Sequence, residues 1–211
     1  MLVIAFILLL AYLLGSIPTS VWLGKVFKGT DLRKHGSGNA GTTNAFRVLG
    51  KPIGIIVLIV DMGKGLLAVS LSFLQSEIAT GSESLMILRI GLGVVAVIGH
   101  IFPVFVGFKG GKGVATMAGV GLALHPLVAL VAMGVYLLIF LISRVSALGS
   151  LTAVFSYPLW MIFVFQTDYQ SLQIFSIFVP ILVIITHRSN IIRMLKGNEN
   201  KMLQKKRKGG A

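Results

Sequence analysis

The sequence of 211 residues contains no cysteine, and this absence excludes several kinds of site. Without thiols the chain forms no disulfide, uses no thiolate nucleophile and holds no metal through cysteine. The four histidines stand far apart in the sequence, at positions 35, 100, 125 and 187. We therefore expect no metal site.

Long polar stretches are also scarce. The chain is 55% hydrophobic and 12% charged, with a mean hydropathy of +0.93, which lies beyond the range of a soluble globular domain. Apolar segments recur up to residue 186, whereas a cleaved signal peptide precedes a polar mature domain. The composition predicts an integral membrane protein whose first apolar segment is a permanent span.

Acidic residues are few, with six aspartates and glutamates against 19 lysines and arginines. A phosphotransferase that acts on CDP-alcohols needs a cluster of aspartates to hold a divalent metal, and six scattered acids do not easily form one. The net charge of +13 could indicate nucleic acid, but in a membrane protein lysine and arginine more often report orientation and contact with anionic lipid. We expect no nucleic-acid partner.

Five segments approach the roughly 20 residues that a helix needs to cross a bilayer, namely residues 2–27, 52–75, 85–106, 147–166 and 170–186. Residues 114–142 are also apolar but contain His125-Pro126, and proline interrupts a helix. Either a short helix is followed by a full one, giving seven crossings, or a re-entrant hairpin leaves five. We expect an all-α, polytopic membrane helical bundle, with seven transmembrane helices favoured, as one domain over residues 1–196 followed by a basic tail over 197–211.

The basic residues predict the orientation of this bundle. With the N-terminus outside, every lysine and arginine except Lys64 and Arg89 falls in an inner loop, at an inner span end or in the C-terminal tail. The positive-inside rule therefore predicts an outer N-terminus and a cytoplasmic C-terminus, with the polar loops gathered on the cytoplasmic face. Within the spans, small residues are expected to let helices pack closely, namely Gly15, Gly63, Gly91, Gly119 and Gly121.

The first inner loop reads HGSGNAGTTNAFR over residues 35–47. Glycines permit conformations in which successive backbone N–H groups converge on an anion. The hydroxyls of Ser37 and Thr43 can donate further hydrogen bonds, and Arg47 supplies a planar fork of donors. The loop predicts an anion site, and the alternative is a flexible loop that caps a helix near residues 42–44.

The stretch GFKGGKGVAT, residues 107–116, is a second candidate. It fails the pattern of a nucleotide-binding P-loop, because Val106 stands where the first glycine belongs and Gly113 follows Lys112 in place of serine or threonine. Glycine amides at a helix start near Val114, with two lysines beside them, nevertheless predict a phosphate site. The alternative is a charged turn that only sets topology.

Three further groups of polar residues stand at or within span ends. HRSNIIR, residues 187–193, places His187, Asn190 and Arg193 on one face of a helix. Asp61 and Lys64 are three residues apart and can form an ion pair inside the bundle. Ser146, close to an inner span end, can add a hydroxyl donor or cap a helix.

These motifs carry a resemblance. SGNAGTTNAFR, GFKGGKGVAT and HRSNIIR, in this order and spacing, resemble the three signature motifs of the bacterial acyl-phosphate-dependent glycerol-3-phosphate acyltransferases, the PlsY family. GSIPTS at residues 15–20 and DMGKG at residues 61–65 are similar to the family as well. The resemblance covers residues 10–195 and excludes the lysine-rich tail.

The resemblance implies acyl transfer from an acyl phosphate to the sn-1 hydroxyl of glycerol 3-phosphate, giving lysophosphatidic acid and inorganic phosphate in phospholipid biosynthesis. It implies a multi-pass enzyme of the bacterial cytoplasmic (inner) membrane, with its active site facing the cytoplasm. No metal or other cofactor is implied, and neither acyl-CoA nor acyl carrier protein serves as donor. The expected partners are the two substrates and anionic membrane lipid, with no obligate protein partner.

Carried over residue by residue, the resemblance gives four catalytic residues, Ser37, Arg47, His187 and Asn190. It makes the amides between Gly38 and Gly41 the cradle of the acyl phosphate, and residues 109–113 the glycerol-3-phosphate site. The expected substrate-binding residues are Gly38, Asn39, Gly41, Thr43, Asn44, Lys64, Lys109, Gly110, Gly111, Lys112, Gly113, Ser146 and Arg193.

The mechanism stays open at this point. Acyltransferases that use thioesters pair a histidine with an aspartate shortly after it, and none of the four histidines here has that partner. The hydroxyl proton can pass to His187 as general base, the acyl group can pass through a covalent Ser37 intermediate, or a phosphate oxygen of the donor can accept the proton. We favour direct transfer between positioned substrates. The alternative function is a transporter of an anionic phosphorylated metabolite, although the spans carry few charges for a pore.

Overall fold

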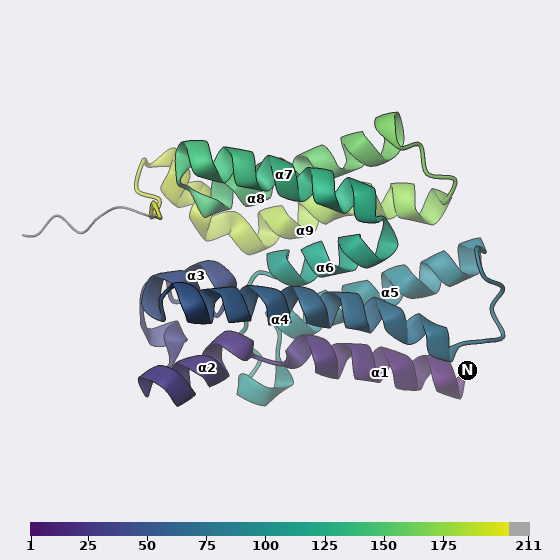
Figure 1. Ribbon diagram of the computed structural model, residues 1–211, viewed down its shortest axis with the longest axis horizontal. Coiled ribbons are helices and arrows are strands. Elements are labelled where there is room, and N and C mark those ends of the chain that lie inside the picture. The colour runs from purple at the N-terminus through teal and green to yellow at the C-terminus, as the bar shows by residue number, and fades with distance from the viewer. Residues whose placement is uncertain (203–211) are drawn as a thin grey trace, which may run out of the picture.

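The protein is a bundle of helices (Figure 1). A computed structural model describes residues 1–202, and no strand occurs within them. The α-helices are α1 (Leu2–Ser16), α2 (Thr19–Lys28), α3 (Thr42–Val48), α4 (Lys51–Ser70), α5 (Glu83–Ile101), α6 (Val114–Leu124), α7 (Pro126–Ser143), α8 (Ser146–Leu159) and α9 (Gln170–Leu195). Short 3₁₀ helices are η1 (Leu32–Lys34), η2 (Leu71–Leu74) and η3 (Val104–Val106), and η4 (Trp160–Val164) is a π-helical turn. The predicted all-α class is confirmed.

Six segments of residues 1–202 are long and apolar enough to cross a membrane. They are Leu2–Lys28, Lys51–Leu74, Glu83–Val106, Pro126–Ser143, Ser146–Val164 and Gln170–Leu195. Each predicted span overlaps one of these, and the sixth comes from the region that the sequence left ambiguous. The part of the predicted basic tail beyond residue 202 lies outside the described residues.

The ambiguous region divides at His125, where α6 ends and α7 begins with Pro126. It therefore consists of a short helix followed by a full one. The 11 residues of α6 span about 17 Å at 1.5 Å per residue, less than the ~30 Å of a hydrocarbon core. The count of seven crossings remains a prediction.

The first span differs from expectation because it is not one continuous helix. α1 ends at Ser16 and α2 begins at Thr19, with Ile17 extended and Pro18 between them. Proline lacks the N–H that would continue the helix, and it also disfavours helical geometry in the residue before it. The break leaves the carbonyl of Ile17 outside a helix and available to a side chain.

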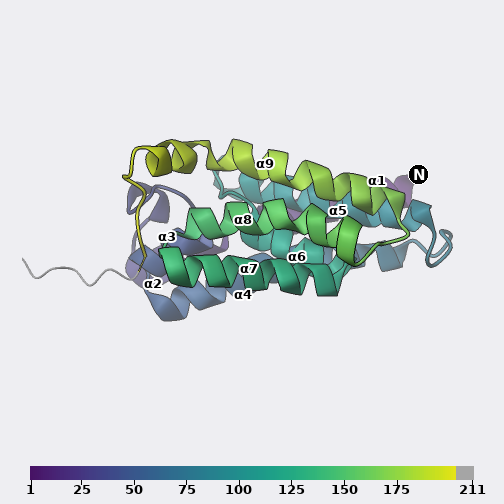
Figure 2. The same ribbon diagram turned by 90° about the horizontal axis from the view of Figure 1, so that it is seen from above.

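The helices form two groups that meet at α6. α1, α4 and α5 pack together, α6 packs on α4, and α7, α8 and α9 form the second group (Figures 1 and 2). Buried side chains around α6 connect the groups, among them Val120, Leu124, Val128, Tyr157 and Met161. The first loop and the third motif both lie near the end opposite the N-terminus (Figure 1).

Two of the predicted close helix contacts are confirmed. Gly15 of α1 packs on the backbone of Ala96 in α5, and Gly119 of α6 packs on the backbone of Met62 in α4, and neither site has room for a Cβ atom. The prediction was wrong for Gly63 and Gly91, where a Cβ atom would meet nothing within 4 Å. Gly121 makes ordinary contacts only. Glycine in a span therefore did not by itself identify a packing face.

Candidate active site

The side chain of Asn44, at the start of α3, holds the first loop in shape. Its Oδ1 accepts a hydrogen bond from the backbone N–H of Ser37 at 2.9 Å. Its Nδ2 lies within 3.0 to 3.2 Å of the carbonyl oxygens of Leu32, His35 and Asn39. The side chain is buried and its amide is used inside the loop. Asn44 therefore organises the loop, and its predicted contact with substrate stays a prediction.

A run of backbone N–H groups in the same loop stays free. The N–H of Gly38 donates to the carbonyl of His35, but within residues 1–202 the N–H groups of residues 39–43 have no protein acceptor. The Thr42 hydroxyl is buried there, also without a partner in the described chain. Buried polar groups are normally hydrogen-bonded, so an acceptor such as a phosphate oxygen suits this loop. Ser37 and Gly38 lie exposed beside it.

The glycine-rich loop, residues 107–113, packs on the C-terminal end of α5. The N–H of Gly110 donates to the carbonyl of Ile101, and that of Gly111 donates to the carbonyl of His100, both at 3.1 Å. A Cβ atom on Gly110 would overlap the carbonyl oxygen of His100, and one on Gly111 would overlap the His100 ring. Glycine is therefore required for this close approach. The N–H groups of Gly110 and Gly111 are therefore used inside the protein, and the predicted contact of these two residues with substrate stays a prediction.

The end of this loop is open to an anion. Within residues 1–202 the N–H groups of residues 112–116 have no protein acceptor. α6 begins at Val114, as predicted, and the first turn of a helix has free N–H groups and a favourable dipole for negative charge. Burial lowers the pKa of the adjacent Lys112 ammonium to about 8. Lys109 is exposed.

The third motif places its polar residues on one face of α9. His187 and Asn190 are one turn apart and both buried. The Nδ1 atom of His187 lies 3.0 Å from the carbonyl oxygen of Val183. The Lys112 ammonium contacts the Oδ1 atom of Asn190. Asn190 therefore connects α9 with the glycine-rich loop.

Three cations gather around the carboxylate of Glu199. The Nε of Arg193 donates to its Oε2 at 2.8 Å, and the Nδ2 of Asn190 donates to its Oε1 at 2.8 Å. Burial lowers the pKa of the Arg47 guanidinium, and the nearby Glu199 carboxylate acts in the opposite direction. The same carboxylate raises the pKa of Lys112 against the effect of burial. α3, the glycine-rich loop and α9 thus each bring one cation to a common region.

α8 meets the first loop through its first residue. The Ser146 hydroxyl lies 2.9 Å from that of Thr43 and 3.0 Å from that of Tyr136. Residues 197–202, predicted as the start of the tail, also pack here, because the N–H of Met202 donates to the carbonyl of Arg144 at 2.8 Å. The packed structure therefore continues beyond residue 196.

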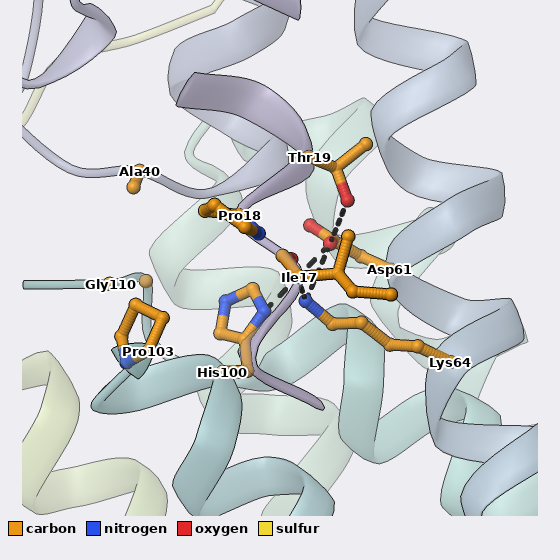
Figure 3. A pocket seen from close by; sticks show the side chains of 10 residues that line it. Ile17, Pro18, Thr19, Ala40, Asp61, Lys64, His100, Pro103 and Gly110 are labelled. Atoms are coloured by element: carbon orange, nitrogen blue, oxygen red, sulfur yellow. Dashed lines mark hydrogen bonds and ion pairs between the residues drawn. The ribbon is translucent and has the colours of Figure 1, made fainter. Parts of the chain in front are cut away.

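A buried charge pair lines the same small cavity as residues of the two loops (Figure 3). The Lys64 ammonium is 2.9 Å from Asp61 Oδ1 and 3.0 Å from the carbonyl oxygen of Ile17. The Thr19 hydroxyl donates to Asp61 at 3.1 Å. The pair therefore fills the break between α1 and α2, with its cation at the C-terminus of α1 and its anion at the N-terminus of α2, as helix dipoles favour. The Lys64 ammonium is therefore engaged inside the protein, and its predicted contact with substrate stays a prediction.

His100 connects this pair with the glycine-rich loop. Its Nδ1 is 3.8 Å from Asp61 Oδ1, its ring packs on Gly111, and its carbonyl accepts the N–H of Gly111. Ala40 of the first loop and Gly110 of the second line the same small cavity (Figure 3). The cavity leaves a volume of about 10 Å³ for the centre of a water molecule. This is close to the volume that one buried water requires. The charge pair is thus in contact with His100, on which the glycine-rich loop packs, and lies next to the first loop at Ala40.

Sequence reasoning missed several residues of this region. Glu199 was assigned to the tail, although a lone acid in a basic segment was a usable signal. His100 and Tyr136 are single polar residues within apolar runs, and Thr19 stands beside Ser20 in the GSIPTS segment. The partners of these three residues become visible only in three dimensions.

The comparisons with known proteins agree on one family. The family model for glycerol-3-phosphate acyltransferase matches residues 5–197. The glycerol-3-phosphate acyltransferase of Macrococcus caseolyticus is 44% identical over 204 residues, which cover 96% of this chain and 99% of the relative. That of Fusobacterium nucleatum subsp. nucleatum is 40% identical over 194 residues, covering 92% and 95%.

Solved structures give the same result. The glycerol 3-phosphate form of PlsY (YgiH), an integral membrane glycerol 3-phosphate acyltransferase, is 41% identical and aligns with a TM-score of 0.83 over 94% of this chain and 95% of its own. A lysophosphatidic acid form aligns with a TM-score of 0.79 at 38% identity, covering 94% of each chain.

Proposed function

The chain belongs to the glycerol-3-phosphate acyltransferase family, and we propose that it transfers an acyl group from an acyl phosphate to the sn-1 hydroxyl of glycerol 3-phosphate. The products are lysophosphatidic acid and inorganic phosphate. The protein is a multi-pass membrane protein and an acyltransferase. The donor, the position of the hydroxyl and the roles of individual residues are the content of the proposal.

The observation that carries the proposal is the meeting of Arg47, Lys112 and Arg193, from three different elements, beside two separate runs of free amides. Two phosphorylated substrates require two anion-binding regions close together. The apolar surface of the bundle accommodates the acyl chain of the donor. A transporter of an anionic metabolite needs charged groups along a pore, and the charge pair within the spans is instead used internally.

Each of the two anion-binding regions then binds the phosphate of one substrate. The free amides of residues 39–43, with Ser37, bind the phosphate of the donor, and Arg47 stabilises charge that develops there. Lys112 and the first turn of α6 bind the phosphate of glycerol 3-phosphate. Asn190 is in contact with Lys112 and fixes the direction of its ammonium. The site is preorganised because each loop is tied to a helix.

The reaction then proceeds by direct transfer. The hydroxyl oxygen attacks the carbonyl carbon of the acyl phosphate, and the bond from that carbon to the phosphate oxygen breaks. The hydroxyl proton passes to an oxygen of the departing phosphate, which leaves as inorganic phosphate and whose second pKa lies near neutrality. With Nδ1 facing the carbonyl of Val183, the Nε2 of His187 is left as an acceptor that orients the hydroxyl.

We place the protein in the bacterial cytoplasmic membrane, with the N-terminus outside and the site and C-terminus on the cytoplasmic side. The support is the distribution of lysine and arginine in the sequence under the positive-inside rule. Anionic lipid contacts the basic residues at this end.

The test is formation of lysophosphatidic acid by the purified protein in detergent. Glycerol 3-phosphate is supplied with either palmitoyl phosphate or palmitoyl-CoA, without added metal, and the acylated position of the product is determined by NMR. Product from the acyl phosphate alone, acylated at sn-1, supports the proposal. Product from the thioester alone overturns the assignment of the first loop. No product from either donor, with folded protein, overturns the reaction and favours the transporter.

A further inference from the structure

Arg33 lies in η1, directly before the first loop, and connects it with the backbone at the start of the glycine-rich loop. Its Nη1 donates to the carbonyl of Val106 at 2.8 Å and to that of Lys109 at 3.3 Å. Within residues 1–202 these are the only hydrogen bonds between residues 29–41 and residues 103–113. The two loops otherwise belong to different helix pairs, the first between α2 and α3 and the second between α5 and α6.

The opposite edge of the guanidinium is held by Asp31. Arg33 Nη2 lies 2.7 Å from Asp31 Oδ2, and Nε lies 3.0 Å from Oδ1. Asp31 Oδ1 also accepts the backbone N–H of Arg33 at 3.0 Å and so caps η1. Arg33 therefore uses both edges of a rigid planar group, which a lysine cannot reproduce.

This pair keeps its charge throughout the neutral range. The hydrogen bond from Arg33 lowers the pKa of the Asp31 carboxyl to about 2. The side chains of Arg33 and Asp31 are 24% and 17% exposed, so the contact lies at the edge of the site and outside the apolar core. Its removal is therefore compatible with folding.

We propose that Arg33 is a positioning residue that sets the spacing between the donor-binding loop and the glycerol-3-phosphate-binding loop. This inference rests on the proposed function, in which each loop holds one substrate. Transfer requires the hydroxyl oxygen and the acyl carbon to approach to about 3–3.5 Å, and a misplacement of about 1 Å costs on the order of a hundredfold in rate. A group that fixes one loop against the other acts on this approach, and not on the binding of either substrate alone.

The first experiment compares the steady-state kinetics of Arg33→Ala, Arg33→Lys and Lys34→Ala. Lys34 is the matched control, because it is the exposed next residue and its loss removes the same charge. We expect Arg33→Ala to lower kcat at saturating substrates by about tenfold to a hundredfold, with KM for each substrate changed less than threefold or so. Arg33→Lys should recover only part of this loss, and Lys34→Ala should match the parent.

The second experiment does not depend on activity. The chain contains no cysteine, so spin labels at the exposed positions His35→Cys and Phe108→Cys report the distance between the loops without interference from native thiols. Arg33→Ala should broaden the distance distribution while Lys34→Ala leaves it unchanged. Broadening in a protein that proves inactive with both donors would support the role of Arg33 in spacing while the proposed reaction fails.

Three results overturn the inference. Arg33→Ala could equal Lys34→Ala in both kcat and label distances. The lost activity could follow the loss of folded protein in thermal unfolding. A rise in KM for glycerol 3-phosphate with unchanged kcat would make Arg33 a support of the second loop alone.

Discussion

Removing the ammonium of Lys64 should destabilise the protein far more than removing an exposed one. The side chains of Lys64 and Asp61 are 3% and 2% exposed. In Lys64→Met, the partners that the Asp61 carboxylate keeps among residues 1–202 are the Thr19 hydroxyl at 3.1 Å and the His100 ring at 3.8 Å. Breaking a buried pair in this way costs about 3–5 kcal/mol. For a chain of this size the midpoint of thermal unfolding should fall by roughly 6 to 20 °C.

The assay is thermal unfolding in detergent, followed by the fluorescence of the two tryptophans. Lys51→Met is the control, since Lys51 begins the same helix and is exposed, and its effect should stay within about 0.5 kcal/mol. The double variant Asp61→Asn with Lys64→Met removes both charges and keeps the shape of the acid. It should be more stable than Lys64→Met alone, because a neutral pair leaves no uncompensated charge. Equal effects of Lys64→Met and Lys51→Met, or strictly additive effects in the double variant, would refute the reasoning.

Three further predictions concern the site. Burial lowers the pKa of Lys112 to about 8, so its ammonium is charged below that pH and neutral above it. The value of kcat/KM for glycerol 3-phosphate should therefore fall above pH 8 by up to about tenfold per pH unit. Lys112→Arg should move this fall to higher pH, and a profile that is flat to pH 9.5 would contradict the prediction. Gly110→Ala forces a Cβ atom onto the backbone of α5, which should lower the free energy of unfolding by about 1–3 kcal/mol and raise KM for glycerol 3-phosphate. Gly134→Ala is the control, because Gly134 faces open space, and it should change neither quantity in the same unfolding and kinetic assays. Ser37→Ala should retain substantial activity if transfer is direct. An acylated Ser37 found by mass spectrometry in the parent protein would exclude direct transfer.

The membrane fold was largely predictable because hydropathy is a local property of the chain. Long apolar runs separated by polar loops identified the spans, and the break at Pro126 was predicted from the proline alone. The same rule applied to Pro18 would have divided the first span. Hydropathy gives no sign of this break, because the run is apolar on both sides of the proline and long enough to cross as one helix.

The site was predictable in its residue types but not in their roles. Glycine and asparagine mark the first loop, yet the sequence does not tell whether an amide faces a ligand or the protein. The side-chain amide of Asn44 donates hydrogen bonds to carbonyl groups around its own loop, and the backbone N–H groups of Gly110 and Gly111 donate to carbonyl groups at the end of α5. These outcomes depend on which carbonyls the tertiary structure brings near.

The distribution of charge follows from the cost of burying it. Inside the spans the fold keeps one full pair, Asp61 and Lys64, which compensates itself and fills the break between α1 and α2. The three cations of the site lie instead at the helix ends and share the carboxylate of Glu199. Anion binding next to the bilayer can then rely on free backbone amides, which carry no net charge and need no counterion when the site is empty. At this site the chain also supplies one acid, Glu199, which balances part of the positive charge of the three cations.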